Sequence, residues 1–108
     1  MVTTIAGGPL GCGVFEDIGT PCGNEFSYPA GLAVDAEGNI YAADYGGNVI
    51  RRVDTRGVIT TVAGSYEAGY ADGPVALARF DGPTSLTIDR GGNLIVADQG
   101  NSTIRKID

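Results

Sequence analysis

The amino-acid sequence predicts an all-β protein built from two copies of one small unit. Its 108 residues leave room for a single small domain. Eighteen glycines and five prolines place about a fifth of the chain in turn-forming residues, which argues against a helical bundle. The third observation is that the sequence matches itself at a shift of 54 residues.

The internal match defines the repeated unit. Residues 28–54 align without gaps on residues 82–108, and 11 of the 27 aligned positions are identical. A second match pairs VTTIAGG at residues 2–8 with ITTVAGS at residues 59–65, at a shift of 57. The chain therefore holds two copies of one unit, and the first connecting loop is three residues longer than the second.

Each unit is expected to contain four short antiparallel strands separated by tight turns, in the first unit over residues 31–34, 39–43, 49–53 and 58–62. Asp35 can bond forward to the backbone and Gly38 can adopt a positive φ, which a hairpin turn between the first two strands requires. Asp89 and Gly92 repeat this turn. For both aspartates, the turn role is favoured over a ligand-binding role.

The first two strands of each unit are apolar on both faces, as IYAA and LIVA show. Such strands suit a sheet that lies between other sheets. Four-stranded sheets that stack face to face around an axis form a β-propeller. A unit of this kind cannot bury its own apolar faces alone.

The motifs GLAVDAEGNIYAAD, VIRRVD and VITTVAG, followed by LTIDRGGNLIVAD and IRKID, resemble the NHL-repeat family of β-propellers. The resemblance covers nearly the whole chain. The second copy is preceded by a connector like that of the family, GYADGP at residues 69–74, followed by an expected helical turn over 75–79, whereas residues 8–27 depart from that pattern. NHL domains are most often six-bladed, so the resemblance implies a ring of that size.

Counted along the chain, the strands make one spare fourth strand at the N-terminal end, one complete blade over about 28–65 and three strands over 82–108. We therefore expect a head-to-tail homotrimer that completes a six-bladed ring, with a homotetramer as the other closed arrangement. The spare strand of one copy would pair with the last strand of the next copy. The exchanged strand comprises Val2, Thr3, Thr4, Ile5 and Ala6, and it pairs with Thr103, Ile104, Arg105, Lys106 and Ile107.

Two cysteines lie ten residues apart in a glycine-rich stretch. Cys12 and Cys22 could form a disulfide or remain two thiols, and without histidine they cannot complete a zinc site. This pair favours an extracellular or periplasmic location for a natural parent protein. Both ends fall at strand boundaries, which suggests a two-blade fragment that was trimmed, reconstructed or designed.

Carboxylates and cations are candidate ligand groups. Asp44 and Asp98 end the second strand of each unit, where they could bind Ca²⁺ or cap a turn, and the turn role is favoured. Arg51–Arg52 and Arg105–Lys106 form a basic stripe on each third strand, interpreted as charges that solvate an outer strand and pair with neighbouring acids rather than as an anion site. We expect no metal and no cofactor.

Aromatic residues lie in or beside the loops. Tyr45, Tyr66 and Tyr70 could form a recognition surface, or the latter two could pack a connector onto a blade as Phe80 is expected to do. Tyr28 and Phe26 are expected to pack the other connector.

The net charge of −6 and a pI near 4.3 argue against nucleic acid, and no apolar run approaches the roughly 20 residues of a membrane span. There is no histidine, which excludes imidazole bases and Ser-His triads. The sequence therefore favours a non-catalytic, self-assembling interaction or scaffold module that is not an enzyme. A metal-dependent, lyase-like propeller enzyme and an extracellular ligand-binding propeller are the alternatives.

Overall fold

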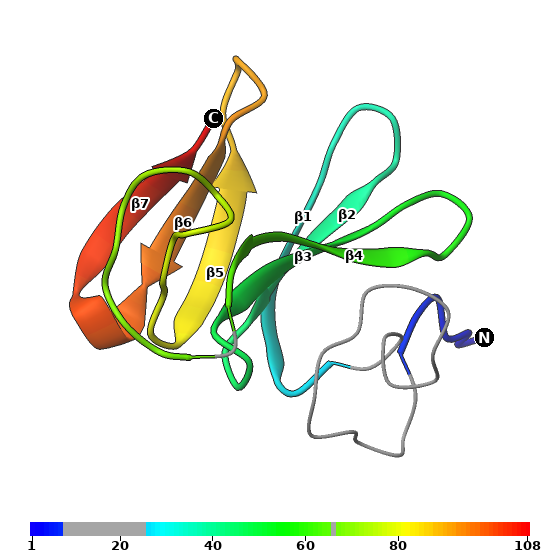
Figure 1. The fold of residues 1–108 in the computed structure, drawn as a ribbon. Coiled ribbons are helices and arrows are strands. Elements are labelled where there is room, and N and C mark those ends of the chain that lie inside the picture. The colour runs from blue at the N-terminus through cyan, green and yellow to red at the C-terminus, as the bar shows by residue number, and fades with distance from the viewer. Residues whose placement is uncertain (8–25, 66) are drawn as a thin grey trace.

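A computed structural model of the chain describes residues 1–7, 26–65 and 67–108, and in it two antiparallel sheets lie face to face (Figure 1). The first sheet has the strand order β1-β2-β3-β4 and the second has the order β5-β6-β7. The strands of the first sheet are β1 (Pro29–Val34), β2 (Ile40–Asp44), β3 (Val49–Val53) and β4 (Ile59–Gly64). Those of the second are β5 (Pro83–Ile88), β6 (Leu94–Asp98) and β7 (Thr103–Ile107), with a short 3-10 helix, η2 (Gln99–Asn101), before β7.

The two sheets repeat one another at the shift of 54 that the sequence shows. Each strand of the second sheet begins and ends 54 residues after its counterpart. The first hairpin of each sheet even carries the same irregularity, a register shift between Pro29 and Gly31 and another between Pro83 and Ser85. The predicted antiparallel units and their boundaries are thus confirmed to within two residues in the first sheet.

The hairpin turns are closed by the aspartates expected there. The carboxylate of Asp35 accepts hydrogen bonds from the backbone N–H groups of Glu37 and Asn39, at 3.0 and 2.9 Å. Asp89 accepts the same pair of bonds in the second sheet, at 2.8 and 2.9 Å. The side-chain amide of Asn39 is the main cause that lowers the pKa of Asp35, and the backbone N–H of Asn93 does so for Asp89.

The core lies between the two sheets. Ala43 and Ile50 of the first sheet, both 0% exposed, belong to the same buried cluster as Leu86, Leu94 and Val96 of the second. Burial of each large side chain contributes about 1.5 to 3 kcal/mol. This stacking accounts for the apolar residues on one face of each sheet.

The strand expected at Val2–Ala6 does not form in the single chain. Residues 1–7 contain no strand and Val2 is almost fully exposed. Part of the segment borders a hollow of about 310 Å³ on the face of the first sheet that points away from β5–β7. A strand needs a partner edge, and the edge of β7 that this segment is expected to pair with lies at the other end of the molecule, where the C-terminus is also found (Figure 1).

The connector between the sheets makes one helical turn, as expected, close to residues 75–79. The backbone N–H of Ala78 donates to the carbonyl of Pro74 at 3.0 Å, and Ala71 forms an isolated antiparallel bridge with Arg79. Across residues 1–7, 26–65 and 67–108, no helix is long and apolar enough to cross a membrane. Cys12, Cys22 and Tyr66 lie outside the described residues, so their predictions are not addressed.

Candidate functional site

Equivalent positions of the two sheets have opposite exposure. Ile50 on β3 is fully buried between the sheets, whereas its counterpart Ile104 on β7 is 74% exposed. The face of the second sheet that points away from the first is therefore the same kind of face that the first sheet uses for stacking. It is left uncovered in the single chain.

The outer face of the first sheet, which points away from the second sheet, also carries an exposed residue whose counterpart is buried. Leu86 on β5 packs between the sheets and is 8% exposed, but its counterpart Leu32 on β1 is 65% exposed. Val34, the next residue on the same face of β1, is 62% exposed. On the same face of the first sheet, however, Ala42, Arg51 and Val53 are buried, so this face is open over β1 and covered farther out. Each outer face is the repeat equivalent of one side of the internal interface.

The last strand is also open along its edge. β3 pairs with β2 on one side and β4 on the other, whereas among residues 1–7, 26–65 and 67–108 β7 pairs only with β6. On β7, Arg105 is buried, and the neighbouring residues Ile104 and Lys106 are exposed. The residues predicted to receive an exchanged strand therefore do lie at a sheet edge.

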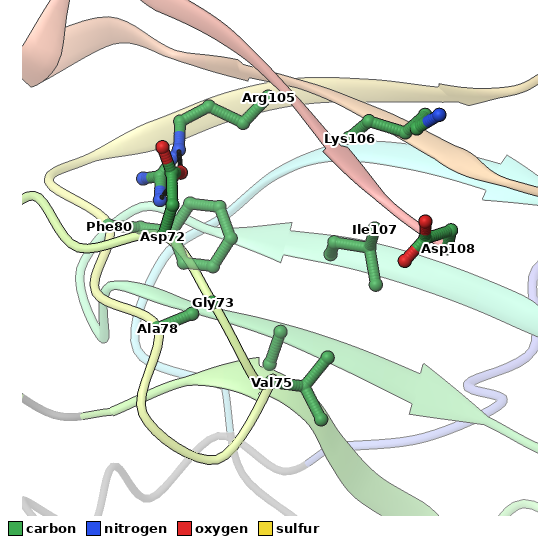
Figure 2. A pocket seen from close by; sticks show the side chains of 10 residues that line it. Asp72, Gly73, Val75, Ala78, Phe80, Arg105, Lys106, Ile107 and Asp108 are labelled. Carbon is green, nitrogen blue, oxygen red and sulfur yellow. Dashed lines mark hydrogen bonds and ion pairs between the residues drawn. The ribbon is translucent and has the colours of Figure 1, made fainter.

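Arg105 is a buried cation that holds the connector onto β7, and Figure 2 shows it beside Asp72 and Phe80 of the connector. Its guanidinium bonds the carboxylate of Asp98 at 2.9 Å and that of Asp72 at 2.7 Å, and it donates to the carbonyls of Ala71 and Arg79. It also lies over the rings of Tyr70 and Phe80, 4.8 and 4.6 Å from their centroids.

Burial opposes the charged form of Arg105, but the hydrogen bonds to Asp72 and Asp98 outweigh it, so the pKa is raised and the group remains a cation. The prediction of solvation is wrong for Arg105 and for its counterpart Arg51, which is 0% exposed, whereas the prediction of pairing with neighbouring acids is confirmed for Arg105. Both side chains point into a face that a neighbouring segment covers, and Arg51 lies 5.9 Å from the ring of Phe26. The cavity beside Arg105 holds about 160 Å³.

Asp44 and Asp98 are fully buried and bind the backbone that leads into each sheet. The Asp44 carboxylate accepts from the N–H groups of Ser27 and Tyr28 at 2.9 and 2.7 Å. Asp98 accepts from the N–H of Asp81 at 2.8 Å and from the amide of Asn101 at 2.7 Å. These contacts support the capping role, and the described parts of the chain contain no group of three or more His, Cys, Asp or Glu that could hold a metal ion.

The loop aromatics divide into two kinds. Phe80 is buried and packs the connector, as predicted, whereas Tyr70 stacks on Arg105 but remains 59% exposed. Tyr45 pairs with Tyr28, with ring centroids 5.5 Å apart, and both rings border a groove between the sheets. From the sequence, Tyr28 was expected to pack a connector onto a blade. Gln99 and Asp81, which line the same groove, were not predicted as site residues.

Comparison with protein families gives two matches along the chain. Residues 9–76 match the Teneurin NHL domain, and residues 80–107 match the NHL repeat. The protein SUPPRESSOR OF QUENCHING 1, chloroplastic, from Arabidopsis thaliana is 40% identical over 83 residues, which are 75% of this chain and 8% of that protein.

Two solved structures share the arrangement of the sheets. A structural genomics protein of unknown function from Bacteroides thetaiotaomicron aligns with a TM-score of 0.77 at 32% identity, over 88% of this chain and 24% of that one. An auxiliary nutrient binding protein from Bacteroides ovatus aligns with a TM-score of 0.72 at 26% identity, over 81% of this chain and 24% of the other. The chain therefore spans about a quarter of the length of these structures.

Proposed function

The chain belongs to the NHL-repeat family of β-propellers, and on this premise we propose that it is a non-catalytic interaction module whose two blades assemble head to tail. In this proposal three copies complete one six-bladed ring. The observation that carries it is the opposite exposure of equivalent residues: Ile50 is buried and Ile104 is 74% exposed, while Leu86 is buried and Leu32 is 65% exposed.

Stacking of the second blade on the first blade of another copy would bury the exposed residues of both outer faces with contacts that the chain already uses internally. Ile104 would take the place of Ile50, and Leu32 the place of Leu86. Each apolar side chain of this size gains about 1.5 to 3 kcal/mol when it is fully buried. The interface is heterologous, so the rotation at each step must close into a ring.

Strand exchange would complete the second blade. Residues 2–8 resemble residues 59–65, and in the first blade the strand β4 (Ile59–Gly64) pairs with β3. Because β7 is the counterpart of β3, the segment Val2–Ala6 of another copy fits the edge that β7 leaves open. Pairing would satisfy the backbone groups along that edge.

The non-catalytic part of the proposal rests on the structural roles of the buried charged side chains. The sequence has no histidine. Asp44 and Asp98 bind backbone amides, and Arg105 is held between Asp72 and Asp98. No described carboxylate is paired with a basic group in a way that would support acid–base catalysis.

The experiment is the absolute mass of the chain in solution by light scattering on a sizing column. Three copies of 11.0 kDa give about 33 kDa, which is the expected result. A mass of about 44 kDa would overturn the six-bladed ring in favour of eight blades. A folded monomer of 11.0 kDa would overturn assembly altogether.

A further inference from the structure

A groove lies between the two sheets at the end where β1 and β5 begin and where β2 and β6 end. It consists of two adjoining hollows of about 630 and 370 Å³. Tyr45 and Gln99 line both hollows. Tyr28 and Thr84 also line the larger hollow, and Asp81 and Gly82 the smaller one. The groove is complete within one chain, so it does not depend on assembly.

Two tyrosine rings form one wall of the groove. Their centroids are 5.5 Å apart with an interplanar angle of 57°, and Tyr28 and Tyr45 are 61% and 44% exposed. Gly82 has a φ of +64°, and a Cβ at this position would lie 2.8 Å from the Tyr45 ring. The absence of a side chain at Gly82 therefore allows the Tyr45 ring to pack directly against the backbone, which fixes one wall of the site.

The charge in the groove is of one sign. Asp81 is the ionisable acid among the lining residues, and no described residue that lines either hollow is basic. Within the described part of the chain, the Asp81 carboxylate makes no hydrogen bond or ion pair, and neither do the side chains of Gln99 and Thr84. The groove thus combines aromatic surface, neutral polar groups and one uncompensated negative charge.

These residues are also where the two repeats differ. The counterparts of Tyr45, Tyr28 and Asp81 at the shift of 54 are Gln99, Gly82 and Ser27. By contrast, Asp44 and Arg51, which are buried, are kept as Asp98 and Arg105. Since each repeat folds with a different residue at the three groove positions, the fold itself does not require two tyrosines and an aspartate there.

We propose that this groove binds an organic cation, an ammonium or guanidinium group carried by a small molecule or by an amino-acid side chain. The negative faces of the tyrosine rings attract such a group, and the Asp81 carboxylate supplies the opposite charge. An anionic ligand would be repelled, and a metal ion of the calcium type needs six or more oxygen ligands, which one carboxylate does not supply. The net charge of −6 adds a general attraction for cations.

The test is a titration followed by backbone NMR, with tetramethylammonium as the probe and tert-butanol as a neutral molecule of similar shape. We expect tetramethylammonium to shift the signals of Tyr45, Gly82 and Gln99 in a saturable way, and tert-butanol to leave them unchanged. Equal shifts with both probes, or shifts that do not saturate, would overturn the proposal.

The repeat supplies variants that are compatible with the fold. Tyr45→Gln and Asp81→Ser each introduce the residue of the other repeat, and each is expected to weaken tetramethylammonium binding about threefold or more. Glu37→Gln is the matched control, since it removes one negative charge at the opposite end of the first sheet and should leave the affinity unchanged. If all three variants bind alike, the attraction is general and the groove is not the site.

Two further probes distinguish the source of the cation. N-acetyl-argininamide presents the charge as an amino-acid side chain, and n-butylammonium presents it as a small amine. Preference for the first supports a basic peptide as the natural ligand, whereas equal or tighter binding of the second supports a small molecule. Failure of both probes to compete with tetramethylammonium would contradict a common cation site.

Discussion

The interface between the two sheets and the two outer faces of the molecule are built from the same repeat positions, yet equivalent residues on the outer faces differ sharply in exposure. Ile50 and Leu86 meet in the core, while Ile104 and Leu32 are mostly exposed. The four residues are almost the same in chemistry. The comparison shows that the exposure of these residues depends on whether another part of the structure covers them, not on the sequence of the blade itself.

A matched pair of substitutions tests this difference most strongly. Ile50→Asp places a charge in the core between the sheets and should cost roughly 5 kcal/mol or more, which would unfold the chain. Ile104→Asp makes the same change on the outer face and should alter the stability of the single chain by less than about 0.5 kcal/mol. Urea unfolding followed by circular dichroism measures both effects, at a dilution where the unsubstituted chain is also a monomer, so that loss of assembly does not contribute.

The Ile104→Asp variant also tests whether copies of the chain assemble through this face. Ile104→Asp is expected to reduce the mass in solution from about 33 kDa to 11.0 kDa while the sheets remain folded. Retention of the larger mass by this variant would contradict the idea that the face around Ile104 receives another blade.

Arg105 and Lys106 offer a comparison between neighbours on β7. Arg105→Ala would leave Asp98 buried without its cation and release the connector, at a cost of about 3 to 5 kcal/mol. Lys106→Ala removes an exposed charge and should change the free energy of unfolding by less than about 0.5 kcal/mol. Similar losses for both variants would show that the contacts of Arg105 do not hold the connector in place.

The close approach of β1 and β5 can be tested at Gly31 and at its repeat counterpart Ser85. A Cβ at Gly31 would lie 2.6 Å from the Cα of Ser85, so Gly31→Ala should cost about 1 to 3 kcal/mol by forcing the sheets apart. Ser85→Ala places the same residue at the equivalent position, where it should have little effect. The difference in urea midpoint between the two variants is the measurement.

Acid should affect the two sheets alike, because their hairpin turns are closed in the same way. The pKa values of Asp35 and Asp89 are lowered from 3.8 in the folded chain. The stability that they contribute is therefore present above pH 3.8 and is lost as the pH falls through their folded pKa values. Asp35→Asn and Asp89→Asn should each reduce the loss of stability between pH 5 and pH 3 to a similar extent, and a large difference between them would contradict equivalent turns.

The repeat made much of the fold predictable. A shift of 54 fixed the strands and turns of the second sheet from those of the first, and the Asp35 and Asp89 turns follow from local hydrogen-bonding chemistry. The segment Val2–Ala6 was predicted as a strand because it resembles Ile59–Gly64, but a strand needs a partner edge, and the single chain does not bring one to it.

Two features of the site were missed for physical reasons. Charged residues on a strand are usually solvated, so the burial of Arg51 and Arg105 was not anticipated. The available signal was the seven-residue spacing from Asp44 to Arg51, repeated from Asp98 to Arg105. The groove was only partly foreseen, through Tyr45, because Asp81 and Gln99 are brought to it by the stacking of the sheets rather than by their place in the sequence.

Amide hydrogen exchange along β7, compared with β3, tests most directly whether the open edge is filled. In an edge strand only alternate amides are hydrogen bonded, whereas a strand with a partner on both sides protects every amide. The proposed exchange with Val2–Ala6 predicts that all amides from Ile104 to Ile107 are protected as they are in β3. Rapid exchange at alternate residues of β7 under conditions where β3 is protected would contradict it.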